Sequence, residues 1–274
     1  IDGKPNKAFY IVADLKDKHL NFTVDTTVGR RLTPKQYFER NNSPIAVVNC
    51  TFFEFVHNSN LNLVMKDGKI FSFNNQSVAG KGKDTFTYKH VLSSAIGIDK
   101  KRNADVAWTY TDSSFKKVFA SQIPFLPKQD SVQKGSLEFY QRITALSKWN
   151  MQTAVGGGPV LLQNGEIKIT NNEELKFAGK AINDKHPRTA IGYTKDGKLI
   201  ILVIEGRFPG KAEGATLLQE AKILKEIGCW EALNLDGGGS SCLLVNGKET
   251  ITPSDKEGER PVPAVFMIQL KNKN

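Results

Sequence analysis

Short apolar runs separated by two-residue turns recur along the chain. Asn-Gly or Asp-Gly pairs stand at 67–68, 164–165, 196–197 and 246–247, each after a run of apolar residues. These residue types accept positive φ at the central positions of a tight turn, which matches the twist of the two strands that the turn joins. The pattern therefore predicts a mixed, largely antiparallel β-sheet core built from hairpins.

Apolar residues at helical spacing appear in three segments. Residues 216–228 open with a capping-box pattern and carry apolar side chains on one face. A shorter helix is expected to start at Thr33, where Pro34 takes the first helical position, and another helix is expected over 136–149. Helices inserted between hairpins predict the α+β class, with a few helices packed on the sheet.

No repeat or low-complexity linker divides the chain, so we expect a single domain over residues 1–274. Residues 1–44 would form an N-terminal strand and helix region, and residues 45–270 carry the motifs. The contents of 39% hydrophobic and 24% charged residues are those of an ordered globular protein. We expect no membrane span, because no apolar run approaches roughly 20 residues. No signal peptide is visible in the polar stretch 1–7.

The formal net charge of +10 suits acidic partners such as phosphates. The excess lysines are dispersed, and no basic block or basic helix with interleaved aromatics occurs, so we expect no nucleic-acid partner. Cys50, Cys229 and Cys242 lack the spacing of metal ligands. We interpret them as buried apolar residues rather than as nucleophiles.

The run Asn-Leu-Asp-Gly-Gly-Gly-Ser-Ser at 234–241 lies between apolar segments. Side chains alternate along a strand, so Asn234 and Asp236 share one face and their oxygens can converge. Successive glycines let backbone N–H groups form a concavity that binds anions. A plain glycine-rich turn is the alternative, but the surrounding polar residues favour a site. The loop residues assigned to phosphate or substrate are Gly237, Gly238, Gly239 and Ser240.

A second polar group lies at the open end of the hairpin that turns at 196–197. Pairing Thr194 with Lys198 in this hairpin brings Arg188 level with Ile204. Two guanidiniums at that end can hold a phosphate by bidentate hydrogen bonds, whereas ordinary surface ion pairs are the alternative. The residues gathered there are His186, Arg188, Thr189, Glu205 and Arg207.

A third candidate is Asn49, which follows the buried-type run containing Val47 and Val48. Its amide both donates and accepts hydrogen bonds, which suits sugar hydroxyls. A Gly-Gly-Gly-Pro turn at 156–159 is expected to serve close backbone packing.

Five sequence blocks, at 49–53, 157–165, 188–192, 234–240 and 260–262, follow one another in a set order. In content and order they resemble the phosphodiester glycosidase family. The third block, Arg-Thr-Ala-Ile-Gly, and the fourth, Asn-Leu-Asp-Gly-Gly-Gly-Ser, match the family pattern without change. Cys50 and Thr51 stand where the family has smaller residues, and Glu205 stands where many members have Asp. In residues 1–48 we recognise no block of the family.

The resemblance implies a hydrolase that cuts between the anomeric carbon of a sugar and a phosphate oxygen. The substrate would be a sugar phosphodiester or a phosphoglycan. An anionic leaving group needs positive charge and N–H donors around it, and the oxocarbenium-like carbon needs a carboxylate. Asp236 is the first choice for this carboxylate and Glu205 the second. The phosphate would be held by the glycine loop, Arg188 and Arg207, with Arg260 or His186 assisting, and sugar hydroxyls by Asn49 and Asn234.

Other classes of function stay open at this point. A non-catalytic module could bind anionic, phosphate-containing glycans through the same residues, and a nuclease-like enzyme could break the P–O bond. No cofactor is required, and Ca²⁺ or Mg²⁺ bound at Asp236, Asn234 or Glu205 is an alternative. The resemblance implies an extracytoplasmic location: periplasmic, cell-surface or secreted.

Overall fold

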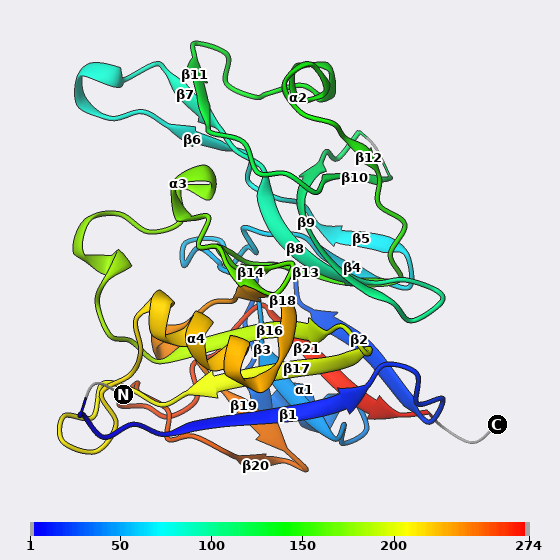
Figure 1. Ribbon diagram of the computed structural model, residues 1–274, viewed down its shortest axis with the longest axis vertical. Helices are drawn as coiled ribbons and strands as arrows, with labels where there is room; N and C mark the ends of the chain where they lie inside the picture. The colour runs from blue at the N-terminus through cyan, green and yellow to red at the C-terminus, as the bar shows by residue number, and fades with distance from the viewer. Residues whose placement is uncertain (1–2, 115, 272–274) are drawn as a thin grey trace.

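The computed structural model describes residues 3–114 and 116–271 and consists mainly of antiparallel sheets (Figure 1). The largely antiparallel architecture with few helices is confirmed. Contrary to the mixed sheet expected from the sequence, the strand pairs in the described residues are all antiparallel. No helix in these ranges is long and apolar enough to cross a membrane.

A six-stranded sheet with the order β1-β17-β16-β18-β14-β15 contains residues of three of the sequence blocks. Its strands are β1 (Ala8–Asp14), β14 (Val160–Gln163), β15 (Glu166–Ile167), β16 (Arg188–Thr194), β17 (Lys198–Ile204) and β18 (Cys229–Asn234). The expected register of the β16–β17 hairpin is confirmed, because Arg188 pairs with Ile204. Ala190 pairs with Asn234, so the start of β16 and the end of β18 meet at one edge of this sheet.

Helix α4 (Leu217–Ile227) covers one face of the six-stranded sheet (Figure 1). The expected capping box forms, since the Thr216 side chain accepts from the Gln219 N–H and the Gln219 side chain accepts in return from the Thr216 N–H. The helix ends at Gly228, whose φ of 98° is accessible to glycine without strain. The apolar stripe of α4 packs against β14, β16 and β17, which fixes the helix start next to Arg188.

A five-stranded sheet with the order β2-β21-β3-β19-β20 lies against the other face. Its strands are β2 (Leu20–Thr26), β3 (Ala46–Asn49), β19 (Leu243–Val245), β20 (Lys248–Glu249) and β21 (Ala264–Leu270), and α1 (Pro34–Arg40) packs on it. The central hydrophobic cluster contains Ile201 of β17, Val48 of β3 and Trp108 of a third sheet. We propose from this shared core that the chain folds as one unit.

The third sheet has seven strands in the order β12-β10-β9-β8-β13-β4-β5, and a small three-stranded sheet, β11-β7-β6, stands beyond it (Figure 1). The strands are β4 (Val64–Lys66), β5 (Lys69–Ser72), β6 (Ser77–Ala79), β7 (Tyr88–His90), β8 (Ser93–Ile98), β9 (Ala104–Thr111), β10 (Val118–Ser121), β11 (Lys128–Asp130), β12 (Ser147–Lys148) and β13 (Thr153–Gly156). The remaining helices are α2 (Leu137–Ile143) and α3 (Asn171–Glu174), with single 3₁₀ turns at Gly82–Asp84, Gly179–Ile182 and Gly238–Ser240.

All four expected two-residue turns join paired strands. In three of them both central residues have positive φ, as at Asn164 (54°) and Gly165 (77°). The helix expected over 136–149 is wrong beyond residue 143. The chain becomes extended at Thr144, and Trp149 donates its backbone N–H to Val118 of β10 (2.9 Å), so sheet pairing overrides the helical spacing there.

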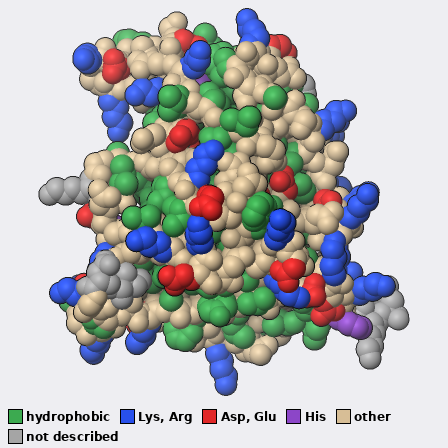
Figure 2. Space-filling model, viewed as in Figure 1, with side chains coloured by type: hydrophobic (Ala, Val, Ile, Leu, Met, Phe, Trp, Pro, Cys, Tyr) green, Lys and Arg blue, Asp and Glu red, His purple; other side chains and the backbone are tan. Residues whose placement is uncertain are grey.

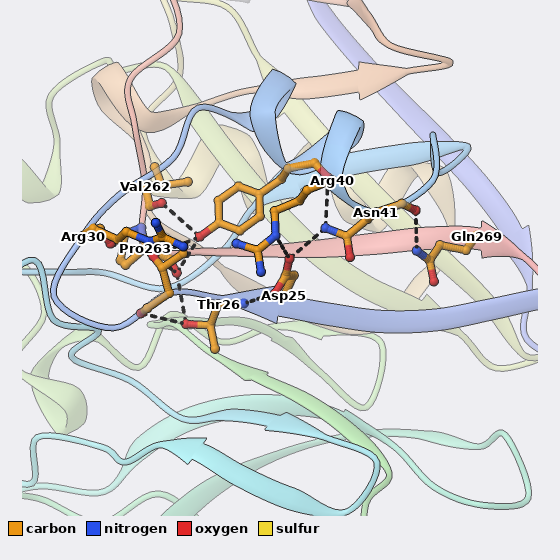
Figure 3. Close-up of polar contacts among 10 residues, drawn as sticks. Asp25, Thr26, Arg30, Arg40, Asn41, Val262, Pro263 and Gln269 are labelled. Carbon is orange, nitrogen blue, oxygen red and sulfur yellow. Dashed lines mark hydrogen bonds and ion pairs between the residues drawn. The ribbon is translucent and has the colours of Figure 1, made fainter.

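Polar contacts join α1 to β2 and to the start of β21 (Figure 3). The buried Tyr37 hydroxyl donates to the Pro263 carbonyl (2.7 Å). Asp25 accepts from Asn41 Nδ2 (2.7 Å) and pairs with Arg40 Nε (3.1 Å). These contacts hold the chain just before β21, which is the segment that carries Arg260.

Replacing Tyr37 by Phe should lower the free energy of unfolding by about 1 kcal/mol, because the buried hydroxyl loses its contacts with the Pro263 and Val262 carbonyls and with Thr27 Oγ1, while Pro263 keeps the bond from the Thr27 N–H. The measurement is urea unfolding, in which a single cooperative transition is expected. Tyr10→Phe, at a side chain that is 53% exposed on β1, is the matched control and should change nothing measurable. Equal stability of the Tyr37→Phe variant and the original protein would contradict the role of this contact.

Candidate active site

The glycine loop between β18 and β19 is anchored to two other segments through its backbone. The Asp236 N–H donates to the Cys50 carbonyl (2.8 Å), and the Gly238 N–H donates to the Pro187 carbonyl (2.9 Å). The segments that carry Asn49, Arg188 and Asp236 therefore lie side by side. The Gly238 N–H, which was expected to bind an anion, is therefore engaged within the protein.

Two guanidiniums lie directly on this loop. A Cβ added to Gly238, whose φ is +62°, would stand 2.8 Å from Arg207 Nη2. A Cβ added to Gly239 would overlap Arg260 Nη2. The positive φ of Gly238 favours glycine there, and at Gly239 a side chain would have to displace the paired Arg260 and Asp255 side chains.

Asp236 is a partly exposed carboxyl group within this cationic loop. Burial raises its pKa to about 6, while the Ser240 side chain and the charge of Arg260 act in the opposite direction. Arg260 Nη1 lies 3.4 Å from Ser240 Oγ, and its other nitrogens bind both oxygens of Asp255 (2.7 and 3.0 Å). Asp255 thereby orients the guanidinium toward Asp236.

Asn49 is fully buried and its amide is engaged within the protein. Nδ2 donates to the Asp236 carbonyl (2.6 Å), and Oδ1 accepts from Thr189 Oγ1 (3.0 Å) and from the Cys242 N–H (3.0 Å). Asn49 and Thr189 therefore hold the loop in position.

Asn234 ends β18 and faces the Gly-Gly-Pro turn. Its Nδ2 donates to the Gly158 carbonyl (2.9 Å), and the Gly158 N–H donates to the Asn234 carbonyl (2.7 Å). Oδ1 of Asn234 is buried and accepts no hydrogen bond within the described residues. This oxygen is the one polar atom of the Asn234 amide left for another donor.

His186, Arg188 and Arg207 form a cluster of cationic groups at the same edge. Burial lowers the pKa of His186, and the charges of Arg188 and Arg207 lower it further. Arg188 is 2% exposed and donates from Nε to the Ala215 carbonyl (2.9 Å) and from Nη2 to the Asp184 carbonyl (3.1 Å). Arg207 is exposed. The structure thus brings together the cations that the sequence singled out.

Glu205 lies at the end of β17 but is engaged elsewhere. Oε1 pairs with Lys7 Nζ (3.3 Å), and Oε2 accepts from the Thr252 N–H (2.8 Å). The side chain is 4% exposed. Through these two contacts its carboxylate joins the N-terminal segment to the loop after β20.

A buried carboxyl group that the sequence analysis did not select, Glu220, lies near Arg188. Glu220 is 0% exposed on α4, and neither side-chain oxygen has a hydrogen-bond partner in the described part of the chain. Burial raises its pKa to about 8, and the charge of Arg188 opposes this shift. A signal was present, since Glu220 follows Leu217 by three residues and precedes Leu224 by four, on the apolar face of the helix.

Lys176 is a second group that sequence reasoning missed. Its Nζ lies 5.5 Å from the centre of the Phe52 ring, which packs edge-on against Phe177 (6.0 Å between ring centres). The Arg188 guanidinium covers the other aromatic ring, at 5.7 Å from the centre of Phe177. Burial lowers the pKa of Lys176. No sequence pattern marked this lysine, because its partners come from distant segments.

Metal binding was left open by the sequence. Across residues 3–114 and 116–271, no group of three or more His, Cys, Asp or Glu side chains is placed to hold a metal ion. Ca²⁺ or Mg²⁺ at Asp236, Asn234 or Glu205 stays an untested prediction. Cys50, Cys229 and Cys242 are buried free thiols.

Comparison with known proteins defines the class to which this fold and loop belong. The profile of a family described as phosphodiester glycosidase matches residues 42–269. The chain therefore belongs to the phosphodiester glycosidase family.

Individual relatives match a shorter part of the chain. N-acetylglucosamine-1-phosphodiester alpha-N-acetylglucosaminidase from mouse is 31% identical over 103 residues, which cover 35% of this chain and 20% of the mouse protein. The human enzyme is 34% identical over 103 residues, with the same coverage. The SPbeta prophage-derived uncharacterized protein YomE of Bacillus subtilis is 42% identical over 74 residues, covering 27% of this chain and 11% of YomE. The chain thus matches only about a fifth or less of the length of these relatives.

Solved structures share the fold over nearly the whole chain. The catalytic domain of the zebrafish N-acetylglucosamine-1-phosphodiester alpha-N-acetylglucosaminidase, auto-inhibited by its pro-peptide, superposes with a TM-score of 0.60 at 20% identity, covering 99% of this chain and 86% of that one. A hypothetical protein from Synechocystis superposes with a TM-score of 0.65 at 15% identity, covering 99% and 60%. At these identities the likeness concerns the fold.

Replacing Glu220 by Gln should remove a pH dependence of stability. The carboxyl group binds its proton more tightly in the folded state (pKa about 8) than in the unfolded chain (4.5). The free energy of unfolding should therefore fall as pH rises from about 4.5 to about 8, by at most roughly 1.4 kcal/mol per pH unit. Urea unfolding across this range should show a flatter profile for Glu220→Gln. The control is Glu226→Gln, at an exposed position of α4; identical slopes for the original protein and Glu220→Gln would contradict the assignment.

Proposed function

We propose that this protein is a hydrolase that releases a sugar from a sugar–phosphate diester by breaking the bond between the anomeric carbon and the phosphate oxygen. Membership of the phosphodiester glycosidase family supports the reaction class. The observation that carries the proposal is the carboxyl group of Asp236, which lies within a loop lined by the guanidiniums of Arg207 and Arg260. This loop combines a carboxylate for the carbon with positive charge for the phosphate.

The leaving group needs stabilisation of negative charge rather than a strong acid, because a phosphate ester leaves as a weakly basic anion. Arg207 and Arg260 are the donors nearest the loop, and Arg188 and His186 add positive charge behind them. Since several loop N–H groups are used within the protein, the guanidiniums carry most of this stabilisation in the proposal.

Asp236 is the proposed group at the anomeric carbon, acting as a nucleophile or activating a water molecule. Its pKa of about 6 leaves it ionised at neutral pH, so it can perform either role. Glu205 is the less suitable candidate, because both of its oxygens are already engaged by Lys7 and Thr252. Asn49 and Thr189 position the loop in this mechanism, and the free Oδ1 of Asn234 is available for a hydroxyl group.

Replacing Asp236 by Asn should lower kcat by about 10²- to 10⁴-fold and leave the fold intact. The substrate is p-nitrophenyl N-acetylglucosamine-1-phosphate, and release of N-acetylglucosamine is measured. In the original protein the rate should rise through pH 6, because the carboxylate is the active form. The control is Asp196→Asn, in an exposed turn. Full activity of a folded Asp236→Asn variant would refute the assignment.

The bond that breaks separates this proposal from a nuclease-like enzyme. Hydrolysis of the same substrate in ¹⁸O-labelled water should place the label in the sugar, because water is expected to add to the anomeric carbon. Label in phosphate would mean P–O cleavage and would overturn the proposed reaction.

A non-catalytic module that binds anionic, phosphate-containing glycans is the second candidate, since the same arginines could hold a phosphate without turnover. Tight binding of the diester with no release of sugar by the original protein would favour it. We extend the main proposal to an extracytoplasmic location, on the family resemblance. Recovery of the protein only in the cytoplasmic fraction of its native cell would contradict that extension.

A further inference from the structure

An exposed aromatic side chain stands beside the glycine loop together with two guanidiniums. Phe55 is 59% exposed. The Arg31 guanidinium lies 4.9 Å from the centre of its ring, and the Arg260 guanidinium lies 5.8 Å from it. Because Arg260 also reaches Ser240 Oγ (3.4 Å), Phe55 is separated from the Asp236 loop by one side chain.

The segment that carries Phe55 is held in a defined shape. The carboxylate of the preceding residue, Glu54, accepts the N–H groups of Val56 (2.7 Å), His57 (2.9 Å) and Ser59 (3.1 Å). The negative charge of Glu54 is thus bound by backbone N–H groups of its own loop. Val56, the next residue, is 83% exposed, so Phe55 belongs to a contiguous apolar surface rather than standing as a single exposed apolar residue.

A second segment is fastened next to it. Asn60 Nδ2 donates to Thr26 Oγ1 (3.0 Å), and Asn58 Nδ2 donates to the Gly29 carbonyl (3.4 Å). These bonds hold the turn after β2 alongside the Phe55 segment. Figure 3 shows this turn between Thr26 and Arg30. Arg31 follows directly on this turn, so its position relative to Phe55 does not depend on one contact alone.

The two guanidiniums differ in their partners. Arg260 is paired with Asp255 through two hydrogen bonds. Arg31 contacts the rings of Phe53 (5.5 Å) and Phe55, and in the described ranges no carboxylate lies within ion-pair distance of it. A guanidinium stacked on an aromatic ring is fixed in orientation but keeps its in-plane N–H donors free. Arg31 is therefore an oriented cation whose charge no neighbouring acid compensates.

We propose that Phe55 and Arg31 form a second subsite, which binds the part of the substrate beyond the phosphate that is cleaved. Phe55 would pack against the apolar face of the next sugar, and Arg31 would bind the phosphate that follows it by paired hydrogen bonds. The substrate class is then a glycan whose sugars are joined by successive phosphodiesters, rather than a single diester on an uncharged chain. This inference rests on the proposed function, because it takes Asp236 as the point of cleavage.

The test compares two substrates that differ beyond the first phosphate. The short one is N-acetylglucosamine 1-phosphate with a methyl ester on its phosphate, which makes it a diester. The long one is a trimer of N-acetylglucosamine units joined by C1–O–P–O–C6 diesters. Phe55→Ala and Arg31→Gln should each lower kcat/KM for the trimer by about tenfold, mainly through KM. Both variants should cleave the short diester like the original protein. Equal losses on the two substrates, or no loss on the trimer, would overturn the subsite.

Matched controls are available on the same molecule. Phe71→Ala removes a phenyl group that is 54% exposed on β5, and Arg142→Gln removes an exposed guanidinium on α2. Neither control should alter the preference for the trimer. A loss of preference in either control equal to that of the subsite variants would mean that general surface charge or apolarity, not the subsite, recognises the substrate.

A binding measurement separates the subsite from the reaction. The Asp236→Asn protein is titrated calorimetrically with the trimer and with a second trimer in which the outer phosphodiester is replaced by an ordinary glycosidic bond. Tighter binding of the fully phosphorylated trimer, lost on adding Arg31→Gln, supports the subsite even if the original protein cleaves nothing. Equal binding of the two trimers overturns it even if the short diester is cleaved, which leaves the proposed function standing.

Discussion

The arrangement of this site depends on the buried amide of Asn49. Its three hydrogen bonds reach the Asp236 carbonyl, the Thr189 hydroxyl and the Cys242 N–H, so a single side chain joins the end of β3 to both ends of the glycine loop and to β16. Without these bonds, buried polar groups on all sides would lose their partners, which costs more than the bonds themselves contribute. The position of Asp236 therefore follows from a buried contact in the core rather than from the loop alone.

Two electrostatic effects at the site are unfavourable for folding: the desolvation of buried charges and the repulsion between neighbouring cations. Several cationic groups meet at one sheet edge, and Arg188 is 2% exposed there, so desolvation acts against its charge. The backbone carbonyls of Asp184 and Ala215, which accept hydrogen bonds from Arg188, offset part of this cost. Burial also raises the pKa of Asp236 to about 6, so this carboxyl group is mostly ionised at neutral pH. An anion bound at the loop would relieve the mutual repulsion of the cations.

The loop and the proposed subsite also share their construction. At both places an arginine lies against a neighbouring group: Arg260 lies against Gly239, and Arg31 lies over the ring of Phe55. The carboxylate of Asp255 binds the Arg260 guanidinium and fixes its orientation. The carboxylate of Glu54 instead binds backbone N–H groups of the Phe55 segment and does not pair with Arg31. In the two proposals together, oriented guanidiniums placed at intervals bind successive phosphates of a repeating anionic chain.

The sequence by itself determined the features that depend on neighbouring residues. Turn residues with positive φ and the capping box at Thr216 follow from contacts within a few positions, and the turn at 196–197 sets the pairing of Arg188 with Ile204. The ordered blocks were enough to indicate the family. Tertiary structure alone decided which side chains form hydrogen bonds and ion pairs with residues far away in the chain. Asn49 meets Asp236 across 187 positions, Glu205 is paired with Lys7, and the chain after Ile143 leaves its helical pattern for a sheet edge. Such outcomes depend on how three sheets pack against one another, and no local pattern of residues carries that information.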